Sequence, residues 1–150
     1  MNIDFFLVKS YVEGDLFLIL LGVFLIGCLS AFGQQEIKVL SYKLNTTDIS
    51  VRTNRRDDPT GKPCALIKVQ FPKRDAQFLG DIVGSVSFKT NEYWVYMPQS
   101  SSQMEVHLEG FKPLVVMFNE FETGVLESNQ STYELCLLAK EKDAPQMYDD

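Results

Sequence analysis

The sequence predicts an all-β protein, a small antiparallel β-sandwich that follows an N-terminal hydrophobic segment. Residues 37–139 contain many short runs in which apolar and polar side chains alternate, as they do in half-buried strands. Glycine, proline, asparagine, aspartate and serine separate these runs, as turns separate strands. After the N-terminal segment, no window of more than ten residues shows the 3.6-residue apolar period of a helix.

Length and charge narrow the class of protein further. Without residues 1–33, roughly 115 residues remain, which is close to the usual size of one domain. The formal net charge is -6, and the 14 Lys and Arg residues are scattered along the chain. A nucleic-acid-binding protein needs a basic stripe that neutralises phosphates, so we expect no nucleic-acid partner.

Residues 1–33 are predicted to be a signal peptide or a membrane anchor. Leu16–Gly33 is almost entirely apolar, and Leu16–Ile26 has the length of a signal-peptide core. Ala31 and Gly33 provide the small residues that precede a cleavage site, so we expect cleavage after Gly33. The protein is therefore predicted to be exported to the periplasm or the cell surface, touching the membrane only through this segment.

Two alternatives to cleavage after Gly33 stay open. The tetrapeptide Leu25-Ile26-Gly27-Cys28 resembles a bacterial lipobox, in which Cys28 would be acylated and would anchor a lipoprotein in the outer membrane. The apolar run is also only slightly shorter than the ~20 residues that span a bilayer, which leaves an uncleaved anchor. Before the run, Asp4, Glu13 and Asp15 stand against a single base, Lys9, so the usual positive segment is missing and the true start codon stays open.

The first half of the domain predicts four strands after an opening one. Ile37–Tyr42 alternates apolar and polar residues, and the polar stretch 45–62 is a predicted loop in which Ile49–Val51 could form an edge strand. The next run has Ala65, Ile67, Val69 and Phe71 on one face. The strands expected after the loop are Cys64–Phe71, Gln77–Leu79, Gly84–Phe88 and Glu92–Met97, the last rich in aromatic residues and ended by a proline.

The second half predicts three more strands and a tail. In Met104–Leu108 the residues Met104, Val106 and Leu108 point inward, and Gly110 then breaks the run. The strands expected here are Met104–Leu108, Leu114–Phe118 and Thr132–Leu138, the last with Tyr133, Leu135 and Leu137 on one face. Residues 140–150 are charged and lack apolar periodicity, which predicts a polar tail or linker.

The order of these motifs resembles the PEGA domain. The segment Pro72-Lys73-Arg74-Asp75-Ala76 stands where that family has its Pro-Glu-Gly-Ala tetrad, although the Glu-Gly pair is missing. An alternating strand with Phe78, the turn glycines Gly80 and Gly84, and the pair Gly110-Phe111 before a closing strand follow in the family's order. The resemblance implies a PEGA/Ig-like β-sandwich over residues 37–139, with Gly80 at a hairpin tip and Phe111 in the core.

The chain is also similar to one branch of exported bacterial proteins with a PEGA-like N-terminal module. That branch has an ALIKV strand and a YWVYM strand, which stand here as Ala65–Val69 and Tyr93–Met97. In those proteins the module often precedes tetratricopeptide-like repeats or a formylglycine-generating-enzyme-like domain, which leaves open whether a downstream domain belongs to this chain. The family offers no catalytic residues, so the resemblance implies a cell-envelope module without enzymatic activity.

The residues with reactive side chains predict no catalytic, cofactor-binding or metal site. His107 is the single histidine and has no Cys or Asp partner at ligand spacing. Ser100–Ser102 lacks the Gly-x-Ser-x-Gly turn of a nucleophilic serine. Cys64 and Cys136 would share an oxidising compartment, so either a disulfide or two separate thiols is compatible with the sequence.

Trp94 and Tyr96 are the candidate ligand contacts. Alternation places them on one side of their strand, with Tyr93 and Val95 on the other, and one of these two faces must be core. We therefore expect a non-enzymatic spacer or protein-interaction module whose partner is another envelope protein. The alternative is a glycan-binding module that stacks sugars on exposed aromatic side chains around Trp94.

Overall fold

The computed structural model describes residues 19, 35–127 and 130–141. The chain divides after Gln34 into two units, and the fold described here is that of the second unit. The predicted signal segment with Cys28 and nearly all of the predicted tail lie outside the described residues. Within the residues that are described, no helix is both long and apolar enough to cross a membrane.

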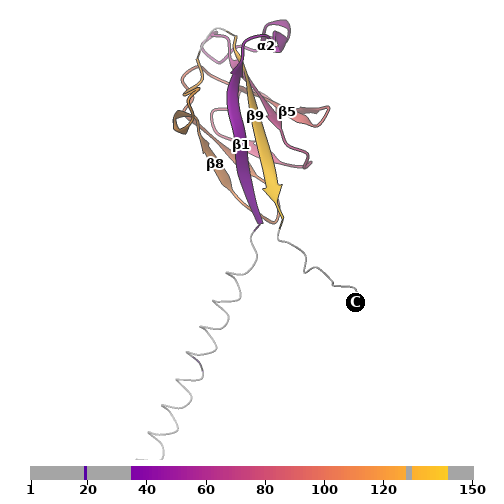
Figure 1. Cartoon of the computed structure of the whole chain (residues 1–150). Coiled ribbons are helices and arrows are strands. Elements are labelled where there is room, and N and C mark those ends of the chain that lie inside the picture. Colours follow the sequence, from indigo (N-terminus) through magenta and orange to yellow (C-terminus); the bar gives the residue numbers. More distant parts are fainter. Residues whose placement is uncertain (1–18, 20–34, 128–129, 142–150) are drawn as a thin grey trace, which may run out of the picture. The chain divides into compact units, whose positions relative to one another are not determined.

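The protein is all-β, as predicted, and its strands form two sheets (Figure 1). The six-stranded sheet has the order β4-β5-β2-β9-β1-β7, and the three-stranded sheet has the order β3-β6-β8. The strands of the first are β1 (Gln35–Asn45), β2 (Ala65–Gln70), β4 (Ser87–Lys89), β5 (Glu92–Met97), β7 (Phe111–Lys112) and β9 (Thr132–Lys140). Those of the second are β3 (Gln77–Leu79), β6 (Gln103–His107) and β8 (Leu114–Met117), and two short helices, α2 (Ser50–Thr53) and η1 (Phe118–Glu120), complete the fold.

The last strand lies in the middle of the six-stranded sheet. β9 pairs antiparallel with β1, from Glu36–Lys140 to Asn45–Thr132, and Figure 1 shows these two long strands side by side. On its other side β9 pairs parallel with β2. β1 and β7 are also parallel, so the predicted purely antiparallel pairing is wrong for this sheet. The alternation of apolar and polar residues predicts where strands lie but not which strands pair. β9 starts at the same end of the sheet as β2, so these two neighbours run parallel.

Both sheets contribute side chains to one hydrophobic core. The side chains predicted to point inward are buried in it: Ala65, Ile67, Val69 and Phe71 on β2 and just after it, Met104 and Val106 on β6, and Tyr133, Leu135 and Leu137 on β9. Phe78 of β3 and Val116 of β8 join the same cluster, and Leu108 packs against it. Phe111 also packs against this core, as the resemblance implied.

A second, smaller cluster covers the opposite face of β2 and β5. It contains Val51, Cys64, Leu66 and Tyr96. The predicted edge strand at Ile49–Val51 is wrong, because Ser50–Thr53 forms α2 instead. The Asp48 carboxylate accepts the Ser50 backbone N–H at 2.8 Å, and this local bond favours a turn over an extended chain.

Several element bounds differ from the predicted ones. β4 begins at Ser87 rather than at Gly84, and β9 continues beyond Leu138 to Lys140, the residue at which the tail was placed. Gly80, Gly84 and Gly110 have φ angles of 134°, 73° and 82°. Gly80 is not a hairpin tip, however, because β3 pairs with β6 rather than with the strand that follows it.

Gly84 is required by a close neighbour as well as by its φ angle. The Arg56 guanidinium donates from Nη1 to the carbonyls of Val83 and Ser85 at 2.8 and 2.9 Å. A Cβ added at Gly84 would lie 2.8 Å from the same Nη1. A larger residue would therefore both strain the backbone and displace the arginine that joins loop 55–64 to residues 83–85.

The central position of β9 predicts that truncating its core face destabilises the whole domain. Leu135 is fully buried, whereas Leu138 on the same strand is 45% exposed. We expect Leu135→Ala to lower the free energy of unfolding by about 2–5 kcal/mol, because it leaves a cavity. The matched variant Leu138→Ala should change it by roughly 0.5 kcal/mol or less. Urea unfolding followed by circular dichroism measures both, and equal effects would contradict the central role of β9.

Candidate functional site

Trp94 lies on the outer face of the six-stranded sheet, where it is half-buried. Its indole N–H donates to the Glu92 carboxylate at 2.8 Å. The Lys89 and Lys68 ammonium groups lie 3.9 and 4.7 Å from the centroid of its ring. Both contacts are cation–π interactions, and they occupy the aromatic surface that a sugar ring would need.

Tyr96, the second predicted ligand contact, is not at the surface. Its side chain is buried in the smaller cluster, and its hydroxyl donates to the Asn54 carbonyl at 2.7 Å. The Arg56 guanidinium lies 4.3 Å from the centroid of its ring. Burial raises the pKa of Tyr96, although the charge of Arg56 acts in the opposite direction. Tyr96 lies on the same side of β5 as Trp94, as the alternation predicts, but α2 and loop 55–64 cover this end of the outer face.

An ion pair beside Trp94 joins the loop after β1 to β2. The Lys68 ammonium lies 2.7 Å from the Asp48 carboxylate and donates to the Ser50 hydroxyl at 2.9 Å. Both charged side chains are about 15% exposed or less. Burial raises the pKa of Asp48, but hydrogen bonds from Lys68 and Ser50, together with the Lys68 charge, outweigh it, and the pKa is lowered overall. Sequence reasoning missed this pair because its residues are far apart in the chain.

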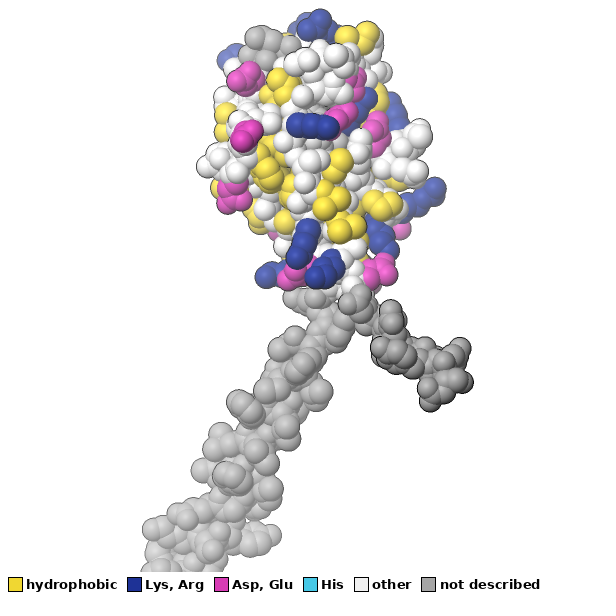
Figure 2. Space-filling view, in the orientation of Figure 1, with side chains coloured by type: hydrophobic (Ala, Val, Ile, Leu, Met, Phe, Trp, Pro, Cys, Tyr) yellow, Lys and Arg dark blue, Asp and Glu magenta, His cyan; other side chains and the backbone are white. Residues whose placement is uncertain are grey.

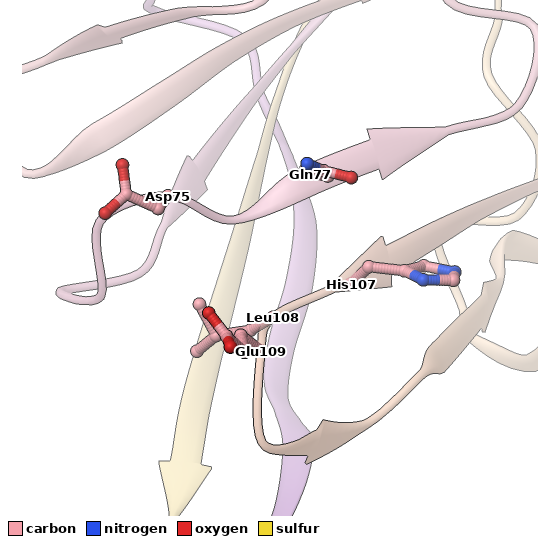
Figure 3. Close-up of a pocket in the computed structure, with 5 residues that line it drawn as sticks. All are labelled: Asp75, Gln77, His107, Leu108 and Glu109. Atoms are coloured by element: carbon pink, nitrogen blue, oxygen red, sulfur yellow. The ribbon is translucent and has the colours of Figure 1, made fainter.

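The second candidate site is a hollow beside His107, with a volume of about 400 Å³. Figure 3 shows Gln77 and His107 on neighbouring strands, β3 and β6, and Asp75 and Glu109 on the loops next to them. The His107 Nε2 lies 2.5 Å from the Glu105 carboxylate, so the imidazole is held on the outer face of its strand. Within the described ranges, no group of three or more His, Cys, Asp or Glu side chains is arranged to hold a metal ion.

The two cysteines of the domain are separate thiols. Cys136 is aligned with Gln70 in the parallel β2–β9 pairing and donates to the Gln70 side-chain carbonyl at 2.9 Å. Cys64 precedes β2 by one residue, so six residues of extended chain, roughly 20 Å, separate it from that position. A disulfide needs Cα atoms within about 7 Å, so the disulfide alternative is wrong for this structure. Burial is the main cause that raises the pKa of the Cys64 thiol.

Comparison with protein-family models, with curated proteins and with solved structures found no match. What the two candidate sites can bind is therefore inferred from their geometry alone. Trp94 with its two lysines is a partly covered aromatic surface, and the hollow at His107 is an open depression with acidic side chains. Neither is an enclosed cavity in which reactive side chains of the described residues converge.

The Lys68–Asp48 pair predicts a specific loss of stability in acid. A lowered folded-state pKa means that ionised Asp48 stabilises the fold above its unfolded pKa, and that this contribution is lost as the pH falls through the folded pKa. Asp48→Asn should have a lower free energy of unfolding than the wild type, as measured by urea unfolding. We expect this difference to shrink as the pH is lowered from roughly 6 to 3. The exposed Asp81 provides the control variant, Asp81→Asn. A difference that grows in acid would contradict the assignment.

Proposed function

We propose that this chain is an exported, non-enzymatic module that serves as a protein-interaction domain or spacer at a bacterial cell envelope. The observation that carries the proposal is the position of large apolar side chains on the outer faces of both sheets. Leu40 and Leu138 are 63% and 45% exposed on the six-stranded sheet, and Leu79 and Val115 are both 48% exposed on the three-stranded sheet. Leu40 and Leu138 lie on the paired strands β1 and β9, and Leu79 and Val115 lie on β3 and β8, on the two sides of β6. Exposed apolar side chains gathered on one face are a feature of surfaces that bind other proteins.

The proposal includes a PEGA/Ig-like β-sandwich. Its support is that the inward side chains of the two sheets fill one core, as the inner faces of a sandwich do. The motif order that resembles the PEGA domain adds to this support, because Gly80, Gly84 and Gly110 all take positive φ angles and Phe111 packs on the core after its turn. A fold alone does not define a function, so the role rests on the exposed surfaces.

The export part of the proposal is tested by the intact mass of the chain purified from the envelope fraction of its bacterial host. We expect a mature chain that begins at Gln34 and carries two free thiols, because Cys64 and Cys136 are far apart. A mass that begins at an acylated Cys28 would assign a lipoprotein, and a mass that begins at Met1 an uncleaved anchor. Recovery of the chain from the cytoplasm alone would overturn the envelope role.

A glycan-binding module is the alternative function, favoured by the half-buried indole of Trp94 on the outer face of the sheet. The lysines over its ring argue against this function, so we expect a glycan array to show no binding by the wild type. Trp94→Ala should then lower the free energy of unfolding by about 1–2 kcal/mol, through the loss of the two cation–π contacts. Sugar binding that disappears in Trp94→Ala at unchanged stability would replace the proposed function with the alternative.

A further inference from the structure

The outer faces of the two sheets carry opposite charge. We define the basic patch as Lys38, Leu40, Lys112, Leu138 and Lys140, on β7, β1 and β9. We define the acidic patch as Asp75, Leu79, Glu105, Glu109 and Val115, on β3, β6, β8 and the adjoining loops. Each patch combines two exposed large apolar side chains with three charges of one sign.

The basic patch is positive because its lysines outnumber their partners. Glu36 is aligned with Lys112 on one side and with Lys140 on the other, so one carboxylate faces two ammonium groups. Lys38 is aligned with Leu138 and is exposed. None of the three lysines has an ion pair within 4.0 Å among the described residues. Figure 2 shows the domain in the orientation of Figure 1, with apolar side chains on the lower half of this view and with Lys and Arg side chains, interspersed with Asp and Glu, at its lower end.

The acidic patch is arranged around Glu105. Leu79 and Val115 are aligned with it on its two sides, so a carboxylate lies between two exposed apolar side chains. Asp75 and Glu109 line the hollow that adjoins this row, at the His107 end of β6 (Figure 3). The strands β3, β6 and β8 contain no Lys or Arg.

The two basic residues nearest the acidic patch in sequence are engaged elsewhere. The Lys73 ammonium forms an ion pair with the Glu141 carboxylate. The Arg74 guanidinium lies 5.7 Å from the centroid of the Phe88 ring, which belongs to the six-stranded sheet. Neither of these two basic side chains therefore pairs with the acidic patch. The close partner within the patch is His107, whose Nε2 lies 2.5 Å from the Glu105 carboxylate and which offsets that charge only when it is protonated.

We propose that the basic patch of one copy of this chain docks on the acidic patch of a second copy. The two patches are complementary in charge, and each offers two leucine or valine side chains to the other. Both sheets send their inward side chains into the same core, so their outer faces point away from it. A contact between two different surfaces is heterologous, and repeating it adds copies head to tail. This inference rests on the proposed function as an interaction module and names the partner.

Charge reversal in both patches tests the contact. The chain is expressed with a donor or an acceptor fluorescent protein fused to its C-terminus and is purified from the host envelope in a non-ionic detergent. Acceptor-labelled chain is then titrated into donor-labelled chain at low salt, and energy transfer between copies is measured. We expect Lys38→Glu and Glu105→Lys each to lower the association constant by about tenfold or more. A mixture of the two variants should restore association to within a few fold of the wild type, because the intact acidic patch of the Lys38→Glu variant meets the intact basic patch of the Glu105→Lys variant.

Controls separate this contact from other causes. Lys62→Glu makes the same charge change in the exposed loop before β2, away from both patches, and should leave energy transfer unchanged. Circular dichroism and thermal unfolding confirm that each variant is folded. Energy transfer that neither reversal changes would overturn the proposal.

The test also separates the inference from the proposed function. If wild-type copies show no energy transfer but cross-link to a different protein in the intact envelope, the second-copy contact is wrong and the interaction module stands. If neither energy transfer nor cross-links to another protein occur, the second-copy contact and the interaction role are both wrong, and the spacer role alone stands. Loss of association in both single variants without recovery in their mixture would also overturn the patch-to-patch contact.

Discussion

The position of β9 between β1 and β2 is the constraint on which the rest of the structure depends. This single strand completes the backbone hydrogen bonding of two others, antiparallel on one side and parallel on the other. Its inward residues, Tyr133, Leu135 and Leu137, are all buried in the shared core. Because strands near both ends of the described domain must meet, most of the fold depends on contacts between residues distant in sequence, which makes folding slow and cooperative.

The strand β2 is packed on both of its faces, so the six-stranded sheet contributes to two clusters of side chains rather than to the main core alone. Tyr42 extends the core side by stacking between Phe118 and Tyr133, with ring centroids 5.2 and 5.7 Å away. On the other side, Lys68 is held by Asp48, so a charged residue in a central strand is satisfied rather than exposed. The same ammonium lies over the Trp94 ring. The aromatic side chain that the sequence offers as a sugar contact is therefore joined through Lys68 to Asp48, in a set of contacts that holds the fold.

Sequence reasoning located most strands because their period is local. The predicted Gln77–Leu79 and Glu92–Met97 coincide with β3 and β5. Sequence reasoning failed where the position of a side chain depends on which other segment of the chain packs against it. The burial of Tyr96 requires α2 and loop 55–64, and the separation of Cys64 from Cys136 requires the register of two strands. The charged patches could not be predicted from the sequence either, because alternation shows which side chains point outward but not which strands become neighbours.

The alignment of Glu36 with Lys140 places the entry and the exit of the chain at the same end of the domain, opposite α2 (Figure 1). A force that pulls these two ends apart would open the β1–β9 ladder one residue pair at a time, like a zipper, rather than shearing all pairs at once. A domain loaded in this way is expected to open at a lower force than one in which the same ladder is loaded in shear.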